Sequence, residues 1–192
     1  MGGHYQRPER GLAVLVGKTV KIVPAKFHGD LRLITDLVVI HSAETSERPS
    51  SAENIAAWFA KPWDGKKWIK ASAHYAVDCD SIVECVPEKM VAWHARGVND
   101  RAIGVELAGR AAQTREEWLD DYGRKMLDLA RELVFATCRN YHLPAQYVSA
   151  EEIRSGKKGV TTHAQVTIAY KIKGGHVDPG PGFPMDYLIG GN

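Results

Sequence analysis

The sequence predicts a single α/β domain with a central mixed β-sheet flanked by helices. Two observations favour this class. Extended apolar segments alternate with helical segments through the middle of the chain, and its 192 residues, 44% of them hydrophobic, suit one domain with a real core. The formal net charge of +2, without a long run of Lys and Arg, argues against a nucleic-acid partner. No apolar run approaches the roughly 18 residues that cross a membrane, so membrane insertion is not expected.

The strands are predicted from short apolar runs bounded by turn residues. Residues 37–40 form a continuous apolar run, which is typical of a strand buried on both faces. Residues 12–16 and 19–23 are expected to form a hairpin within an N-terminal extension of residues 1–30, with residues 1–10 loose and the main domain at 31–192. The other predicted strands are residues 71–77, 82–86, 102–107 and 159–162.

The helices are predicted from their starting signals and apolar spacing. A capping box at residues 50–53 predicts a helix to about Phe59. A second capping box at residues 114–117 predicts a long helix to about Asn140, with apolar residues at three- and four-residue spacing on one face. A further helix is expected at residues 164–170.

Tryptophans and cysteines add two expectations. Trp58 and Trp118 are interpreted as core residues. Cys79, Cys85 and Cys138 make an odd number in a chain without the apolar segment of a signal peptide. Free thiols in a protein made in a reducing cytoplasm are therefore expected.

Two of the eight histidines stand where open α/β sheets place their ligands. His41 directly follows the buried strand at 37–40, and His163 follows the extended segment at 159–162. Residues at the carboxyl ends of such strands face the crevice in which ligands bind. Taken singly, each histidine is still more often structural than a ligand.

The segment GGHVDPGPGFP, residues 174–184, contains four glycines, three prolines, His176 and Asp178. A residue before proline favours an extended backbone, so His176 and Asp178 are expected to project the same way. Two imidazoles and one carboxylate are a typical ligand set of catalytic zinc. The alternative is that Asp178 only caps a turn.

Glu106 is a candidate general base. Counting by two along 102–107 places Ala102, Gly104 and Glu106 on one face, and two such small residues indicate a face open to a cleft. A carboxylate in a cleft beside an attacking water would accept its proton. A glutamate in open solvent is an equally good interpretation of the pattern alone.

Together these segments resemble the zinc amidase family of peptidoglycan hydrolases, over about residues 36–183. The matching segments, in family order, are LVVIHSAE, ASAHYAVD with VAWHARGVND, RAIGVEL, and VTTHAQV followed by HVDPGPGF. The resemblance implies one Zn²⁺ ion with His41, His163 and Asp178 as ligands. It also implies Glu106 as the base, or as the residue that orients the water.

The resemblance implies roles for four further residues. His176 occupies a position that is often lysine in the family, where it would donate to the oxyanion of the tetrahedral intermediate. A histidine there loses its charge near pH 6.5 unless its pKa is shifted, so the pH dependence stays open. His74, Trp93 and His94 are expected to bind substrate.

The implied activity is that of an N-acetylmuramoyl-L-alanine amidase acting on bacterial peptidoglycan, as a monomer and as a phage endolysin. An endolysin without a signal peptide would reach the wall after release by a separate holin. The alternatives are a cytoplasmic amidase that recycles anhydro-muropeptides and a non-catalytic peptidoglycan-binding domain. Asp178 favours an enzyme, because some recognition proteins of the family lack that ligand and bind the cell wall without cutting it. The stem-peptide specificity, for which Arg96 and Arg101 are candidates, and the removal of a wall-binding module stay open.

Overall fold

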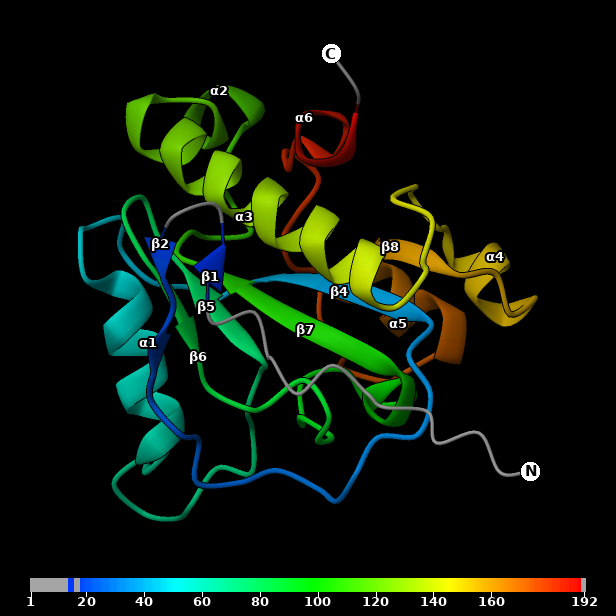
Figure 1. Cartoon of the computed structure of the whole chain (residues 1–192), viewed down its shortest axis with the longest axis horizontal. Coiled ribbons are helices and arrows are strands. Elements are labelled where there is room, and N and C mark those ends of the chain that lie inside the picture. The colour runs from blue at the N-terminus through cyan, green and yellow to red at the C-terminus, as the bar shows by residue number, and fades with distance from the viewer. Residues whose placement is uncertain (1–13, 16–17, 191–192) are drawn as a thin grey trace, which may run out of the picture.

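The computed structural model describes residues 14–15 and 18–190, and it confirms an α/β domain built on a mixed sheet (Figure 1). The six-stranded sheet has the order β3-β6-β5-β7-β4-β8, and only the β5–β6 pair in it is antiparallel. Its strands are β3 (Lys21–Ile22), β4 (Leu37–Ser42), β5 (Tyr75–Val77), β6 (Ile82–Glu84), β7 (Ala102–Leu107) and β8 (Gly159–Thr162). The helices are α1 (Ser51–Ala60), α2 (Arg115–Trp118), α3 (Asp121–Asn140), α4 (Ala150–Arg154), α5 (His163–Tyr170) and α6 (Met185–Ile189), with a 3-10 turn at Asn99–Arg101.

The two faces of the central strand β4 pack against different helices. Val38 and Ile40 lie in the large core that includes α3 residues, whereas Leu37 and Val39 lie in a second core with residues of α4 and α5. Side chains alternate along a strand, so His41 continues the face of Val39, toward α5. The alternation of β4 therefore decides which helix His41 can meet.

The described part of the molecule contains no helix long and apolar enough to cross a bilayer. The described strands lie where the sequence predicts them, although β5 and β6 are shorter than expected. The short helices α4 and α6 were not predicted.

The start of α1 differs from the predicted capping box. Ser50 has a left-handed backbone (φ 77°) and makes no side-chain capping bond. Instead, the carboxylate of Asp78 accepts a hydrogen bond from the backbone N–H of Ala52 at 2.9 Å. Glu53 pairs with Lys21 and accepts from the hydroxyl of Ser81. A cap from a turn 26 residues away replaces the local one.

The prediction of a single long helix after residue 114 is wrong. The capping box of Thr114 forms, but α2 ends at Trp118 and α3 begins anew at Asp121. The carboxylate of Asp120 caps α3 by accepting from the N–H of Gly123 at 2.7 Å. A Cβ on Gly123 would lie 2.1 Å from the carbonyl oxygen of Trp118, so the bend depends on glycine.

The predicted N-terminal hairpin is confirmed in part. β1 (Val14–Leu15) pairs antiparallel with β2 (Lys18–Thr19), while Lys21–Ile22 leaves the hairpin and joins the main sheet beside β6. Residues 1–13 and 16–17, including the expected loose N-terminus, lie outside the described residues. The domain boundary at residue 31 stays a prediction, although Ala25 already belongs to the main core.

Candidate metal centre and active site

The parallel pairing of β4 and β8 brings two histidines together. Ile40 pairs with Thr162, and each of these two residues is followed one position later by a histidine, at the same edge of the sheet. His41 is the fifth residue of β4, and His163 is the first residue of α5. Both are buried, with 2% and 5% exposure. The predicted position of both histidines at strand ends is confirmed.

The glycine- and proline-rich segment delivers Asp178 to the same place. The carbonyl of Asp178 accepts the backbone N–H of Ala164 in the first turn of α5 at 3.0 Å. Further along, the segment packs against residues 111–115. A Cβ on Gly180 (φ 93°) would lie 1.9 Å from the carbonyl oxygen of Ala111, and one on Gly182 would lie 2.3 Å from that of Gln113. These glycines are required because backbone meets backbone here.

His41, His163 and Asp178 meet in a geometry that fits a zinc ion. Nδ1 of His41 lies 3.1 Å from Nδ1 of His163 and 3.2 Å from Oδ2 of Asp178, and Oδ1 of Asp178 lies 3.2 Å from Nδ1 of His163. Ligand atoms held tetrahedrally at about 2.0–2.1 Å from zinc lie about 3.3 Å apart. Two imidazole nitrogens and one carboxylate oxygen are the donors that catalytic zinc takes. The chain's own donor set therefore fits one zinc ion.

The charges at the three side chains agree with a cation site. Burial lowers the pKa of His41, which keeps its ring neutral and able to bind a metal. Burial alone would raise the pKa of Asp178, but its hydrogen bonds with His163 and His41 outweigh burial and lower that pKa. The cluster therefore holds one carboxylate ready for a cation.

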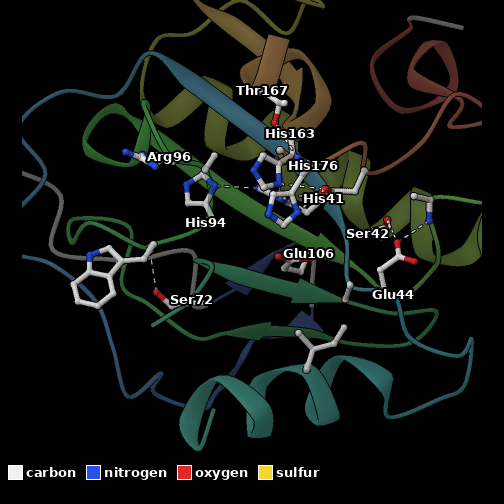
Figure 2. Close-up of a pocket in the computed structure, with 18 of the residues that line it drawn as sticks. His41, Ser42, Glu44, Ser72, His94, Arg96, Glu106, His163, Thr167 and His176 are labelled. Carbon is white, nitrogen blue, oxygen red and sulfur yellow. Dashed lines mark hydrogen bonds and ion pairs between the residues drawn. The ribbon is translucent and has the colours of Figure 1, made fainter. Parts of the chain in front are cut away.

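His94 supports His41 from the side away from Asp178. Nδ1 of His94 lies 3.0 Å from Nε2 of His41 (Figure 2). When Nδ1 of His41 binds a metal, its Nε2–H can donate to His94, which fixes the imidazole plane. A Cβ on Gly104 would lie 2.5 Å from the His94 ring, so the small residue of β7 makes room for this support. The side-chain amide oxygen of Asn99 accepts a hydrogen bond from the backbone N–H of His94 at 3.0 Å.

Glu106 faces the same centre from β7. It is the register partner of His41 across the β4–β7 pair and lines the cavity, as the alternation of small residues predicted (Figure 2). Burial, with the nearby charges of Asp178 and Glu44, raises the pKa of Glu106 to about 8. A carboxyl with this pKa can both accept and return a proton near neutral pH.

His176 stands at the open side of the cluster. Its ring stacks on that of His163, with centroids 4.1 Å apart, and its Nδ1 lies 3.4 Å from Oδ1 of Asp178. Its side chain is 66% exposed, unlike those of the three metal-binding candidates. The backbone N–H of His176 donates to the hydroxyl of Thr167 at 3.1 Å. His176 thus borders both the candidate metal position and the cavity described below.

The cluster opens into a cavity of about 1030 Å³. Trp93 and His94 line it, as predicted for substrate-binding residues, and so does Arg96. His74 does not: its ring is fully buried, with Nδ1 accepting from the N–H of Gly104 and Nε2 beside the carbonyl of Met90. The prediction that His74 contacts substrate is therefore not supported, because both ring nitrogens are used by the backbone.

Of the remaining sequence-based expectations, some are confirmed and one is wrong. Trp118 is fully buried, as predicted, but Trp58 is 43% exposed and lines the cavity, so its assignment to the core is wrong. Arg101 is engaged by Asp36 and by the hydroxyl of Tyr170. Cys79, Cys85 and Cys138 are free thiols.

Sequence reasoning missed Glu44, Thr167 and Asn99 as parts of the site. Glu44 lines the cavity, accepts from Ser42 at 2.9 Å and from the N–H of Ala111 at 2.8 Å, and adds negative charge near Glu106. Its position three residues after His41 was the available signal. The roles of Thr167 and Asn99 rest on hydrogen bonds from the backbone N–H groups of His176 and His94, nine and five residues away in the sequence, and no helix or strand periodicity indicates these contacts.

Comparisons with known proteins agree with this geometry. Residues 32–181 match the sequence model of a family described as N-acetylmuramoyl-L-alanine amidase. A search of curated proteins finds no match.

Solved structures share the fold. The hydrolase AmiA of Staphylococcus aureus, in complex with its ligand, is similar with a TM-score of 0.58 and 20% identity, over 84% of this chain and 73% of that one. The amidase LysC of Clostridium intestinale URNW gives a TM-score of 0.55 and 18% identity, over 89% and 95%. From the same organism, the endolysin amidase LysCS gives 0.54 and 16%, over 88% and 92%. Because the family match covers most of the sequence, the chain belongs to the N-acetylmuramoyl-L-alanine amidase family.

Proposed function

We propose that this amidase is zinc-dependent and hydrolyses the bond between the lactyl group of N-acetylmuramic acid and L-alanine in peptidoglycan. The observation that carries the proposal is the convergence of His41, His163 and Asp178 at tetrahedral-edge distances beside Glu106. These three side chains would hold one zinc ion. The ion would supply a Lewis acid that polarises the scissile carbonyl and favours ionisation of the attacking water.

Different residues of the chain would transfer protons, stabilise the reacting carbonyl oxygen and bind the substrate. Glu106 accepts the proton of the attacking water and returns it to the amine of L-alanine as that amine leaves. His176, at the exposed side of the cluster, donates to the carbonyl oxygen as that oxygen gains negative charge. His94 holds the His41 ring in one orientation and acts through it. Trp93, at the cavity wall, offers an apolar face to the sugar or lactyl group.

The activity is tested with purified peptidoglycan and the full chain. We expect free L-alanyl amino termini to appear with time, to stop appearing after treatment with a chelator, and to return when zinc is added. New reducing sugar ends are not expected, because no glycosidic bond is cut. Release of L-alanyl termini that is unchanged by chelator would exclude the zinc mechanism, and an absence of such termini would exclude the amidase activity.

We further propose that the protein acts as an endolysin, as a monomer, on the intact cell wall after release by a separate membrane-permeabilising protein. The name of the similar LysCS supports this role. A recycling amidase would instead prefer soluble anhydro-muropeptides. Comparing kcat/KM on intact sacculi and on soluble anhydro-muropeptide decides between them, since an endolysin must cleave the sacculi efficiently.

A further inference from the structure

Four aromatic rings form a continuous patch that begins in the cavity and leaves it. Trp93, at the cavity wall, stacks on Phe27 with ring centroids 6.1 Å apart and an interplanar angle of 11°. Phe27 meets Trp68 edge-on at 6.3 Å, and Trp68 meets Trp63 edge-on at 5.3 Å. We call these four residues the aromatic patch. It joins the active-site cavity to the loop that follows α1, at the lower left of Figure 1.

The outer half of the patch is built to stay at the surface. Trp63 and Trp68 pair as an antiparallel bridge, and the carboxylate of Asp64 accepts the backbone N–H groups of Lys66 and Lys67 at 2.8 and 2.7 Å. This tight turn fixes the two indoles against each other. Trp63 and Trp68 remain 44% and 42% exposed, so neither ring is buried in the core. Large apolar surfaces that stay exposed in a group mark sites of interaction.

Positive charge surrounds this end of the patch. Residues 61–70 contain four lysines and one aspartate. Nζ of Lys26 lies 4.2 Å from the centroid of a Trp68 ring, and Lys70 lines the active-site cavity. A ligand that fits must therefore offer apolar faces to the rings and negative groups to the lysines.

We propose that the aromatic patch binds the glycan strand of peptidoglycan beyond the sugar that carries the cleaved bond. Pyranose rings present flat faces of C–H groups that pack on indoles, while their hydroxyls stay in water. A polymer with one sugar at Trp93 must run its neighbouring sugars out of the cavity, and the patch continues from that residue. Carboxylates of stem peptides not yet cleaved suit the lysines. This inference rests on the proposed function, because it takes peptidoglycan as the substrate.

The test compares a polymer with its fragment. The double variant Trp63→Ala/Trp68→Ala and the wild-type chain, both treated with chelator so that the wall stays intact, are sedimented with purified sacculi. We expect the variant to bind at least about tenfold more weakly, equivalent to about 1.4 kcal/mol. With zinc restored, its kcat/KM should fall by about the same factor on sacculi relative to a soluble N-acetylmuramoyl dipeptide. Tyr147→Ala is the matched control, because Tyr147 is 40% exposed beside the opposite edge strand, β8.

The outcomes are distinct. Unchanged binding to sacculi would overturn the inference, and so would an equal loss of kcat/KM on sacculi and fragment, which would mean a disturbed active site. A loss of binding to anionic lipid vesicles without a loss on sacculi would overturn it in favour of a membrane surface. Failure of the wild-type chain with zinc to release L-alanyl termini from sacculi would instead refute the proposed function, whereas the sedimentation measures binding independently of catalysis. Matching thermal unfolding curves confirm that both variants are folded.

Discussion

The raised pKa of Glu106 makes the stability of the metal-free protein depend on pH in a way that one substitution removes. Its ordinary value is 4.5, and burial with the charges of Asp178 and Glu44 raises the pKa to about 8. Between these values the unfolded chain has lost this proton while the folded chain keeps it. The folded state binds more protons than the unfolded state there, so the free energy of unfolding falls as pH rises. The stabilisation is full below pH 4.5 and is lost as pH rises through about 8.

The size of this effect follows from the same values. Each pKa unit corresponds to about 1.36 kcal/mol, so the whole interval between pH 5 and 8 sets an upper limit of about 4 kcal/mol. Glu106 is only partly buried and lines the cavity, so solvent screening reduces the electrostatic cost of its charge. We therefore expect wild type to lose about 2–3 kcal/mol relative to Glu106→Gln between pH 5 and pH 8. Glutamine keeps the shape of the side chain and cannot titrate.

The assay is urea unfolding of both chains in chelator at several pH values. Glu116→Gln, at an exposed glutamate of α2, controls for the loss of one carboxylate and should follow the wild type. Added zinc should flatten the difference, because a nearby cation stabilises the ionised carboxylate and lowers its pKa. A wild-type minus Glu106→Gln difference that stays constant from pH 5 to pH 8 would refute the reasoning. Glu106 would then not be a base held near neutrality by burial.

Four further substitutions test the supports of the site and the core. His94→Phe should weaken zinc affinity about 10- to 100-fold in competition with a chromophoric chelator, because His41 loses its orienting partner; unchanged affinity would contradict that role. Gly104→Ala should cost about 1–3 kcal/mol in urea unfolding and also weaken zinc binding, since the new Cβ would lie 2.5 Å from the His94 ring. Trp118→Ala should cost about 3–5 kcal/mol of unfolding free energy, while Trp58→Ala should cost under about 1 kcal/mol; equal costs would refute this account of their burial.

The sequence predicted the positions of the candidate-site residues best where local geometry decides them. His41 lies near the carboxyl end of β4 and His163 directly follows β8, and parallel strands in register bring their ends together. The period of two along β7 placed Glu106 on the cleft side, because Ile103, Val105 and Leu107 fill the core on the other. In these cases a short-range pattern and a general rule of sheets were sufficient.

The predictions failed where a distant residue decides. The N-terminus of α1 is capped by Asp78 from a β-turn, so the local Ser50 box is not needed. Trp58 and Trp118 both lie in helices, but whether each ring is buried depends on what packs against its side of the helix, which the local sequence does not show. His74 directly precedes β5, in a stretch (residues 72–78) in which every residue is buried, so alternation could not indicate whether its ring reached the cavity.

The division of roles between Asp178 and His176 is the central claim, and zinc content tests it most directly. Wild type, Asp178→Ala and His176→Ala are purified, equilibrated with limiting free zinc, and measured for bound metal, kcat and thermal unfolding. We predict one zinc ion per chain in wild type and in His176→Ala, a large loss of kcat in His176→Ala, and zinc well below one ion per chain in a folded Asp178→Ala. Full zinc in Asp178→Ala, or loss of zinc in His176→Ala to the same extent, would contradict the account.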